Sequence, residues 1–106
     1  MAPLQELFET HAIVKILDFL TTFKDFEYSK TDIAKETEIS RRTLYEVFPI
    51  LEKFELVTNT RSFGQVNYYK LNSNSSICRL LTRLADEIAL FNAEKETGIK
   101  LTSDIE

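Results

Sequence analysis

The chain has 106 residues, of which 43% are apolar and 28% charged, and this composition is typical of one globular domain with a sizeable core. Two Gly and two Pro favour long regular elements, and the absence of low-complexity tracts excludes fibrous and disordered classes. The net charge of −4 argues against nucleic acid as a partner. However, residues 29–70 carry seven basic and six acidic side chains, whereas both flanking parts are net acidic, and DNA binding depends on local charge.

Features that the sequence lacks limit where the protein can be located in the cell and which chemical activities it can have. No apolar run approaches the roughly 18 residues of a membrane span, and residues 1–11 lack the basic start of a signal peptide. The single Cys78 excludes an internal disulfide and suits a reducing compartment, so we expect a cytoplasmic protein. No Cys, His and acidic cluster has metal-ligand spacing, and neither a phosphate loop nor a nucleophile beside a base is present. We therefore predict no metal, no cofactor and no enzymatic activity.

Helices are predicted over the first half of the chain. Apolar residues recur at helical spacing between residues 13 and 23, which predicts one long helix over residues 4–23. A second helix is predicted to begin after Ser29, where Ser29 and Asp32 form an S-x-x-D capping pattern, and to end near Glu38. A third runs from Ser40 towards Phe54, with a kink expected near Pro49.

The spacing of the apolar residues changes in the second half of the chain. Residues 56–61 and 65–71 are rich in β-branched and aromatic side chains, and they predict a hairpin with a turn at residues 62–64. A last helix is predicted over residues 74–97, ended by Gly98. The predicted order of helix, helix, helix, hairpin, helix is a mainly α fold with a β-hairpin, in the α+β class.

Residues 29–72 resemble the winged helix-turn-helix of small archaeal and bacterial transcriptional regulators. The positions where that motif keeps apolar or small residues are Ile33, Ala34, Ile39, Leu44 and Val47. The run ILEKFELVTNT at residues 50–60, followed by an aromatic strand, resembles the junction into the wing. The resemblance implies a helix-turn-helix at 29–54 and a wing at 56–71 within one domain, 1–106. Glu38 and Glu55 stand where the family often has Gly, which leaves open how the backbone turns there.

The resemblance also implies which residues contact DNA, because the start of the third helix would enter the major groove and the wing would meet the backbone or minor groove. On the third helix these residues are Ser40, Arg41, Arg42, Thr43 and Tyr45; at the start of the second helix they are Ser29, Lys30 and Thr31; on the wing they are Arg61, Gln65 and Asn67. Other roles stay open. One arginine can instead pair with a carboxylate, Ser29 to Thr31 can simply cap, and Tyr45 can pack half-buried.

The apolar residues of the two terminal helices exceed what one small core can bury, which predicts a homodimer. The predicted interface consists of Leu4, Leu7, Phe8, Leu80, Leu81, Leu84, Ile88 and Phe91. In the alternative, the last helix folds back and completes its own core. His11 and Cys78 are expected to have packing roles. The sequence thus predicts sequence-specific binding of double-stranded DNA by a homodimeric transcriptional regulator. The alternative, which the acidic balance favours, is a winged-helix protein–protein interaction module of a transcription-related complex.

Overall fold

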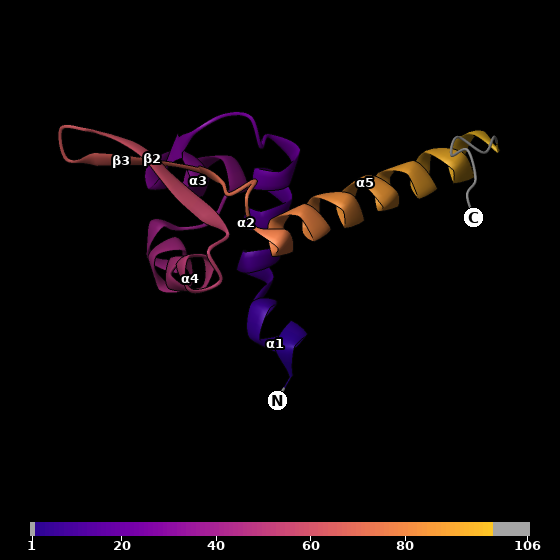
Figure 1. Cartoon of the computed structure of the whole chain (residues 1–106), viewed down its shortest axis with the longest axis horizontal. Helices are drawn as coiled ribbons and strands as arrows, with labels where there is room; N and C mark the ends of the chain where they lie inside the picture. Colours follow the sequence, from indigo (N-terminus) through magenta and orange to yellow (C-terminus); the bar gives the residue numbers. More distant parts are fainter. Residues whose placement is uncertain (1, 99–106) are drawn as a thin grey trace.

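The computed structural model describes residues 2–98, so the ends of the predicted domain, residues 1 and 99–106, lie outside the described residues. The elements in chain order are α1 (Pro3–Leu7), α2 (His11–Thr22), β1 (Tyr28–Ser29), α3 (Lys30–Thr37), α4 (Arg41–Lys53), β2 (Val57–Phe63), β3 (Val66–Leu71) and α5 (Ser76–Thr97). Figure 1 shows α2, α3 and α4 gathered beside a small sheet, from which β2 and β3 project as a wing. This architecture confirms the predicted α+β class.

The prediction of a single helix over residues 4–23 is wrong, because one helix ends at Leu7 and another begins at His11. The Thr10 side chain accepts a hydrogen bond from the backbone N–H of Ile13 at 3.4 Å and starts α2 as a separate helix. Threonine is among the residues that best supply such a cap. The apolar spacing does not reveal this break, since both helices carry apolar residues and neither Gly nor Pro separates them.

The other helix starts follow their predicted caps. The hydroxyls of Ser29 and Ser40 accept hydrogen bonds from backbone N–H groups three residues later, at 3.1 and 3.0 Å. Ser75 caps α5 in the same way, so this helix begins two residues later than predicted. Gly98 ends α5 in the left-handed conformation at φ 72°, as its position predicts. Helix α4 continues through Pro49.

The sheet has three antiparallel strands in the order β1-β3-β2, so β3 lies in the middle. The two-residue β1 was not predicted. The hairpin turn lies at Gly64 and Gln65 instead of residues 62–64, with Gly64 at φ 62° in the first central position. The pairing of β2 with β3 shifts between Asn59 and Arg61, which makes Thr60 the extra residue of a β-bulge.

Side chains from α2, α3, α4 and one face of the sheet form the core. Its fully buried large members are Ile13, Ile16, Leu20, Ile33, Leu44, Phe48, Leu51, Leu56 and Cys78. Among the described residues of α5, only Cys78 is buried. The core therefore belongs to the winged-helix body, and α5 contributes its first turns to it.

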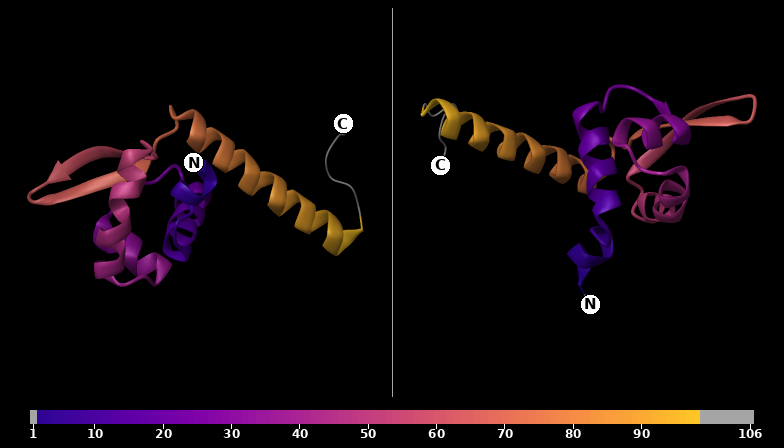
Figure 2. Two further views of the ribbon diagram at one scale, coloured as in Figure 1. Left: turned by 90° about the horizontal axis from the view of Figure 1, so that it is seen from below. Right: turned by 180° about the vertical axis from the view of Figure 1, so that it is seen from behind.

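Helix α5 and the wing leave this body on opposite sides (Figures 1 and 2). The Cα radius of gyration is 15.4 Å, compared with about 13 Å for a compact domain of this length. The difference is explained by α5, whose 22 residues span about 33 Å at the helical rise per residue. Most of α5 therefore extends beyond the surface of its own body.

Candidate nucleic-acid interface

A polar hollow of about 210 Å³ lies where the starts of α3 and α4 meet the wing. Seven of the eleven predicted DNA-binding residues line it: Ser29, Lys30, Thr31, Arg41, Tyr45, Gln65 and Asn67. Val66 and Tyr69 complete the lining. Residues from three separate parts of the sequence thus come together on one face, which we call the polar hollow.

The polar hollow is cationic although the chain as a whole is acidic. Lys30 and Arg41 line it, and no Asp or Glu of the described chain does. The Lys30 ammonium lies 4.7 Å from the centre of the Tyr45 ring and 4.6 Å from that of Phe48. Contacts with ring faces stabilise a cation without neutralising its charge. Lys30 is therefore held in position and stays available to an anion.

The starts of α3 and α4 present backbone N–H groups on this side of the molecule. Ser29 is 8% exposed, and it forms a reciprocal capping box with Asp32 through two hydrogen bonds of 3.1 Å. Ser40 caps α4, and its hydroxyl also bonds to that of Thr43 at 2.9 Å. The capping roles considered for these serines are thus present, and contact with DNA remains a prediction for them.

The two arginines at the start of α4 have different surroundings. Arg42 forms an ion pair with Glu46, one turn later, at 3.4 Å, and the two side chains are 89% and 61% exposed. A surface pair of this kind is weak and easily exchanged. Arg41 is exposed and lines the polar hollow. The alternative of pairing with a nearby carboxylate therefore describes Arg42.

Arg61 is not part of the polar hollow. It pairs across the hairpin with Tyr68, whereas Tyr69, the next residue of β3, lines the hollow, and successive side chains of a strand face opposite ways. The guanidinium lies 4.2 Å from the Tyr68 ring centre and bonds to Glu27 at 2.7 Å. This ion pair lowers the pKa of the Glu27 carboxyl below its ordinary value, with the Thr60 hydroxyl as the second cause.

Glu27 and the rings that hold Lys30 could not be predicted from the sequence. Glu27 precedes Arg61 by 34 residues, and no local pattern links the two. Phe63 is 72% exposed at the wing tip, opposite Val66. The wing tip therefore carries an exposed apolar pair.

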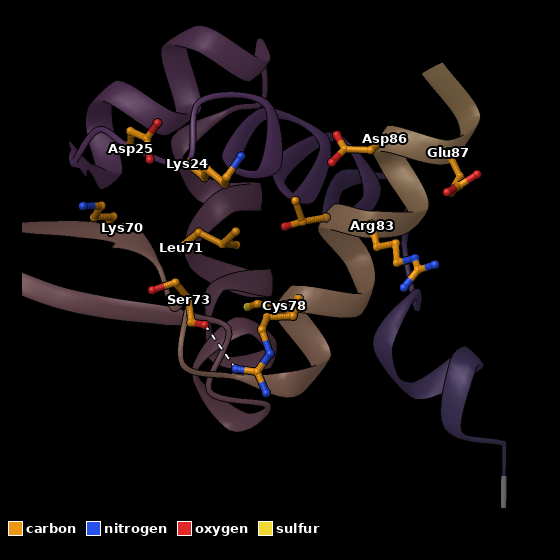
Figure 3. Close-up of a pocket in the computed structure, with 11 residues that line it drawn as sticks. Lys24, Asp25, Lys70, Leu71, Ser73, Cys78, Arg83, Asp86 and Glu87 are labelled. Atoms are coloured by element: carbon orange, nitrogen blue, oxygen red, sulfur yellow. Dashed lines mark hydrogen bonds between the residues drawn. The ribbon is translucent and has the colours of Figure 1, made fainter. Parts of the chain in front are cut away.

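A second hollow, of about 510 Å³, lies between α5, the end of β3 and the segment after α2 (Figure 3). Cys78 and Leu71 are buried at its base, while Lys24, Arg83 and Asp86 stand at its rim. Burial raises the pKa of the Cys78 thiol, which donates a hydrogen bond to the Leu56 carbonyl at 3.2 Å. The packing role expected for Cys78 agrees with these contacts.

The residues predicted to form a dimer interface fall into two groups. Leu4, Leu80, Leu84, Ile88 and Phe91 are between 52% and 71% exposed, and Phe8 is 36% exposed. Leu7 is 6% exposed and packs within the core, so little of its side chain is left to contact a second copy. Leu81 is partly buried against the core. An apolar groove of about 380 Å³ runs between α2 and α5, lined on the α2 side by Phe8, Val14 and Leu17.

Residues 2–98 lack two kinds of feature. No three His, Cys, Asp or Glu side chains of this part lie close enough together to hold a metal ion. No helix of the same part combines the length and apolarity needed to cross a membrane.

Comparison with known proteins identifies the fold. No protein-family model matches the sequence, and no curated protein matches it. Among solved structures, NolR from Sinorhizobium fredii is similar at a TM-score of 0.61 and 24% identity, over 78% of this chain and 77% of that one. The antimony-specific transcriptional repressor AntR is similar at 0.62 and 13%, over 86% and 75%. A double mutant of Lactococcus lactis ZitR in its apo form is similar at 0.61 and 16%, over 91% and 74%. The chain therefore shares the winged helix-turn-helix fold of these structures.

Proposed function

We propose that this protein is a transcriptional regulator that binds double-stranded DNA with the face that contains the polar hollow. The observation that carries the proposal is the charge of that hollow: two cations and no acid line it, in a chain of net charge −4. Solubility alone does not require two cations to line one hollow without an acid beside them. AntR, which shares the fold, is a transcriptional repressor.

The polar hollow suits a phosphate of the DNA backbone. Lys30 supplies a fixed ammonium, Arg41 a guanidinium, and α3 the positive end of its helix dipole. With a phosphate held there, the first turn of α4 would lie in the major groove, where Arg42 and Thr43 can reach base edges. Gln65 and Asn67 would follow the adjacent backbone from the wing.

We further propose that the regulator is a homodimer, formed by the exposed apolar face of α5 with α1 and the groove between α2 and α5. Leu80, Leu84, Ile88 and Phe91 recur every three or four residues on α5, so they share one face of the helix. A helix gains most of its stability in water from packing such a face. A second copy supplies an apolar surface of matching kind, and a two-fold axis joins the same residues on both chains.

The DNA proposal is tested by titrating a labelled duplex of random sequence at several salt concentrations. The wild type should bind with an affinity that falls steeply as salt rises, because binding releases counterions from phosphates. Arg41→Ala/Arg42→Ala should flatten the slope of log K against log salt by at least about 0.9, which is the change for the one phosphate contact that Arg41 loses.

A matched control removes two cations from elsewhere: Lys24→Ala/Lys95→Ala, in the segment after α2 and near the end of α5. This variant should keep nearly the wild-type slope. If both double variants flatten the slope equally, only net charge matters and the proposed face is wrong. If the wild type binds no duplex at any salt concentration, the DNA proposal fails and the protein–protein alternative takes its place.

A further inference from the structure

Glu27 holds Arg61, the arginine of the wing, in an ion pair. It lies directly before β1, and its Oε2 accepts a hydrogen bond of 2.7 Å from Nε of Arg61. Its other carboxylate oxygen accepts a hydrogen bond from the Thr60 hydroxyl. The Tyr68 ring lies under the guanidinium, 4.2 Å from its central carbon. Arg61 is thus fixed by an anion on one edge and a ring on one face.

The β-bulge makes this arrangement possible. In a regular strand the successive side chains of Thr60 and Arg61 would point to opposite faces of the sheet. Because Thr60 is the extra residue of the bulge, both side chains reach the same carboxylate. Glu27 enters from the opposite edge of the sheet, since β3 lies between β1 and β2. The contact therefore spans all three strands.

The charge balance at the wing follows from this contact. The Arg61 side chain is 52% exposed and that of Glu27 33%, so both are within reach of a ligand at the surface. As an ion pair they contribute no net charge, and a phosphate that approaches Arg61 meets the Glu27 carboxylate as well. Carboxylate and phosphate compete for the same N–H donors of a guanidinium.

We propose that Glu27 is an autoinhibitory carboxylate that withholds Arg61 from the phosphates of DNA. This inference rests on the proposed DNA-binding function. It means that the wild-type protein binds DNA through the polar hollow and α4, with Arg61 neutralised in place on the opposite face of the wing. Any change that removes the charge of Glu27 then frees the Arg61 guanidinium for one further phosphate contact from that face.

The test is the salt dependence of duplex binding by Glu27→Gln, which keeps the size of the side chain and removes its charge. The slope of log K against log salt should steepen by about 0.9, and binding at 0.05 M salt should tighten on the order of tenfold. Circular dichroism of each variant verifies that it is folded. In the Arg61→Gln background the same Glu27 substitution should leave the slope unchanged.

Glu52→Gln is the matched control, since it changes the net charge equally from an exposed position on α4. A steepening by Glu27→Gln that exceeds that of Glu52→Gln, and that requires Arg61, supports the proposal. An unchanged slope, or an equal steepening without Arg61, overturns it while leaving DNA binding intact. If the wild type binds no duplex, the proposed function itself fails and this inference with it.

Discussion

Glu38 and Glu55 have backbone angles in the left-handed region, at φ 59° and φ 55°. Each follows a helix and reverses the chain. After Glu55, the N–H of Leu56 bonds back to the Leu51 carbonyl at 2.8 Å, and the residue after Glu38 bonds back to α3 in the same way at 3.0 Å. This closing pattern requires a positive φ, which is usually supplied by Gly. In both turns a residue other than Gly adopts a backbone conformation that costs about 1–2 kcal/mol for an L-residue.

Glu38→Gly and Glu55→Gly should therefore each stabilise the protein. Relief of the left-handed strain gains about 1–2 kcal/mol, and the extra backbone freedom of Gly in the unfolded chain takes back about 0.5–1 kcal/mol. We expect a net gain in the free energy of unfolding of about 0.5–1 kcal/mol each, measured by urea denaturation. Glu36→Gly, within α3, is the control and should destabilise by a similar amount. Destabilisation by all three substitutions would contradict the strain argument.

The structural roles of some single residues can be predicted from the sequence, and those of others cannot. Ser29 and Ser40 act on N–H groups three residues away, so their capping roles could be predicted from the sequence alone. The family resemblance located the turns at Glu38 and Glu55, but it left their backbone conformation open. The partner of Arg61 could not be predicted, because it depends on a sheet edge 34 residues distant and on a bulge.

At the scale of elements, α3 depends on its first turn. It has eight residues, which is too few for a helix to be stable alone in water. The capping box between Ser29 and Asp32 satisfies two backbone N–H groups at its start, and Ser29 also pairs with Tyr68 of β3 as the last residue of β1. The start of α3 is therefore positioned by the cap and the sheet together, and Lys30 is its first residue.

Asp32→Ala should destabilise the protein by about 1 kcal/mol, because it removes half of the capping box and an anion from the positive end of the helix. The loss should appear in urea denaturation at neutral pH although the substitution lowers the acidity of the chain. Glu36→Ala is the matched control, since it removes an exposed acid from the same helix outside the cap. Equal effects of the two substitutions would mean that the capping box contributes nothing.

Element boundaries were predictable where a local signal marks them. Gly98 ends α5 as predicted, whereas the break between α1 and α2 depends on Thr10 within an apolar run that reads as continuous. Strand β1 has two residues and exists only because β3 pairs with it, so no pattern in its own sequence indicates it. The polar hollow is a further step from the sequence, since it needs α3, α4 and the wing in their relative positions.

At the scale of the whole molecule, the direction of α5 bears on the choice between a dimer and a closed monomer. Its first turns pack on the body through Cys78 and Leu81, which is what a helix that folds back would do. Beyond them the helix leaves the body (Figure 2). Leu84, Ile88 and Phe91 of this part are each more than half exposed. A two-fold interface would cover this apolar face and fix the distance between the two copies of α4, the helix proposed to enter the major groove.

Leu84→Glu/Ile88→Glu should convert the proposed dimer to a monomer, because two carboxylates would be buried without partners in each half of the interface. Sedimentation velocity should give twice the chain mass of 12.3 kDa for the wild type and one chain mass for the variant. The control Arg83→Glu introduces an acid one residue away, on the side of α5 that lines the larger hollow, and should leave the dimer intact.

The monomeric variant should stay folded, since neither Leu84 nor Ile88 belongs to the core. Its affinity for a duplex should fall further than the loss of any one contact explains, because two joined DNA-binding faces gain from their high effective concentration. A wild type that sediments as a monomer at micromolar concentration would instead mean that the exposed face of α5 serves a partner other than its own copy.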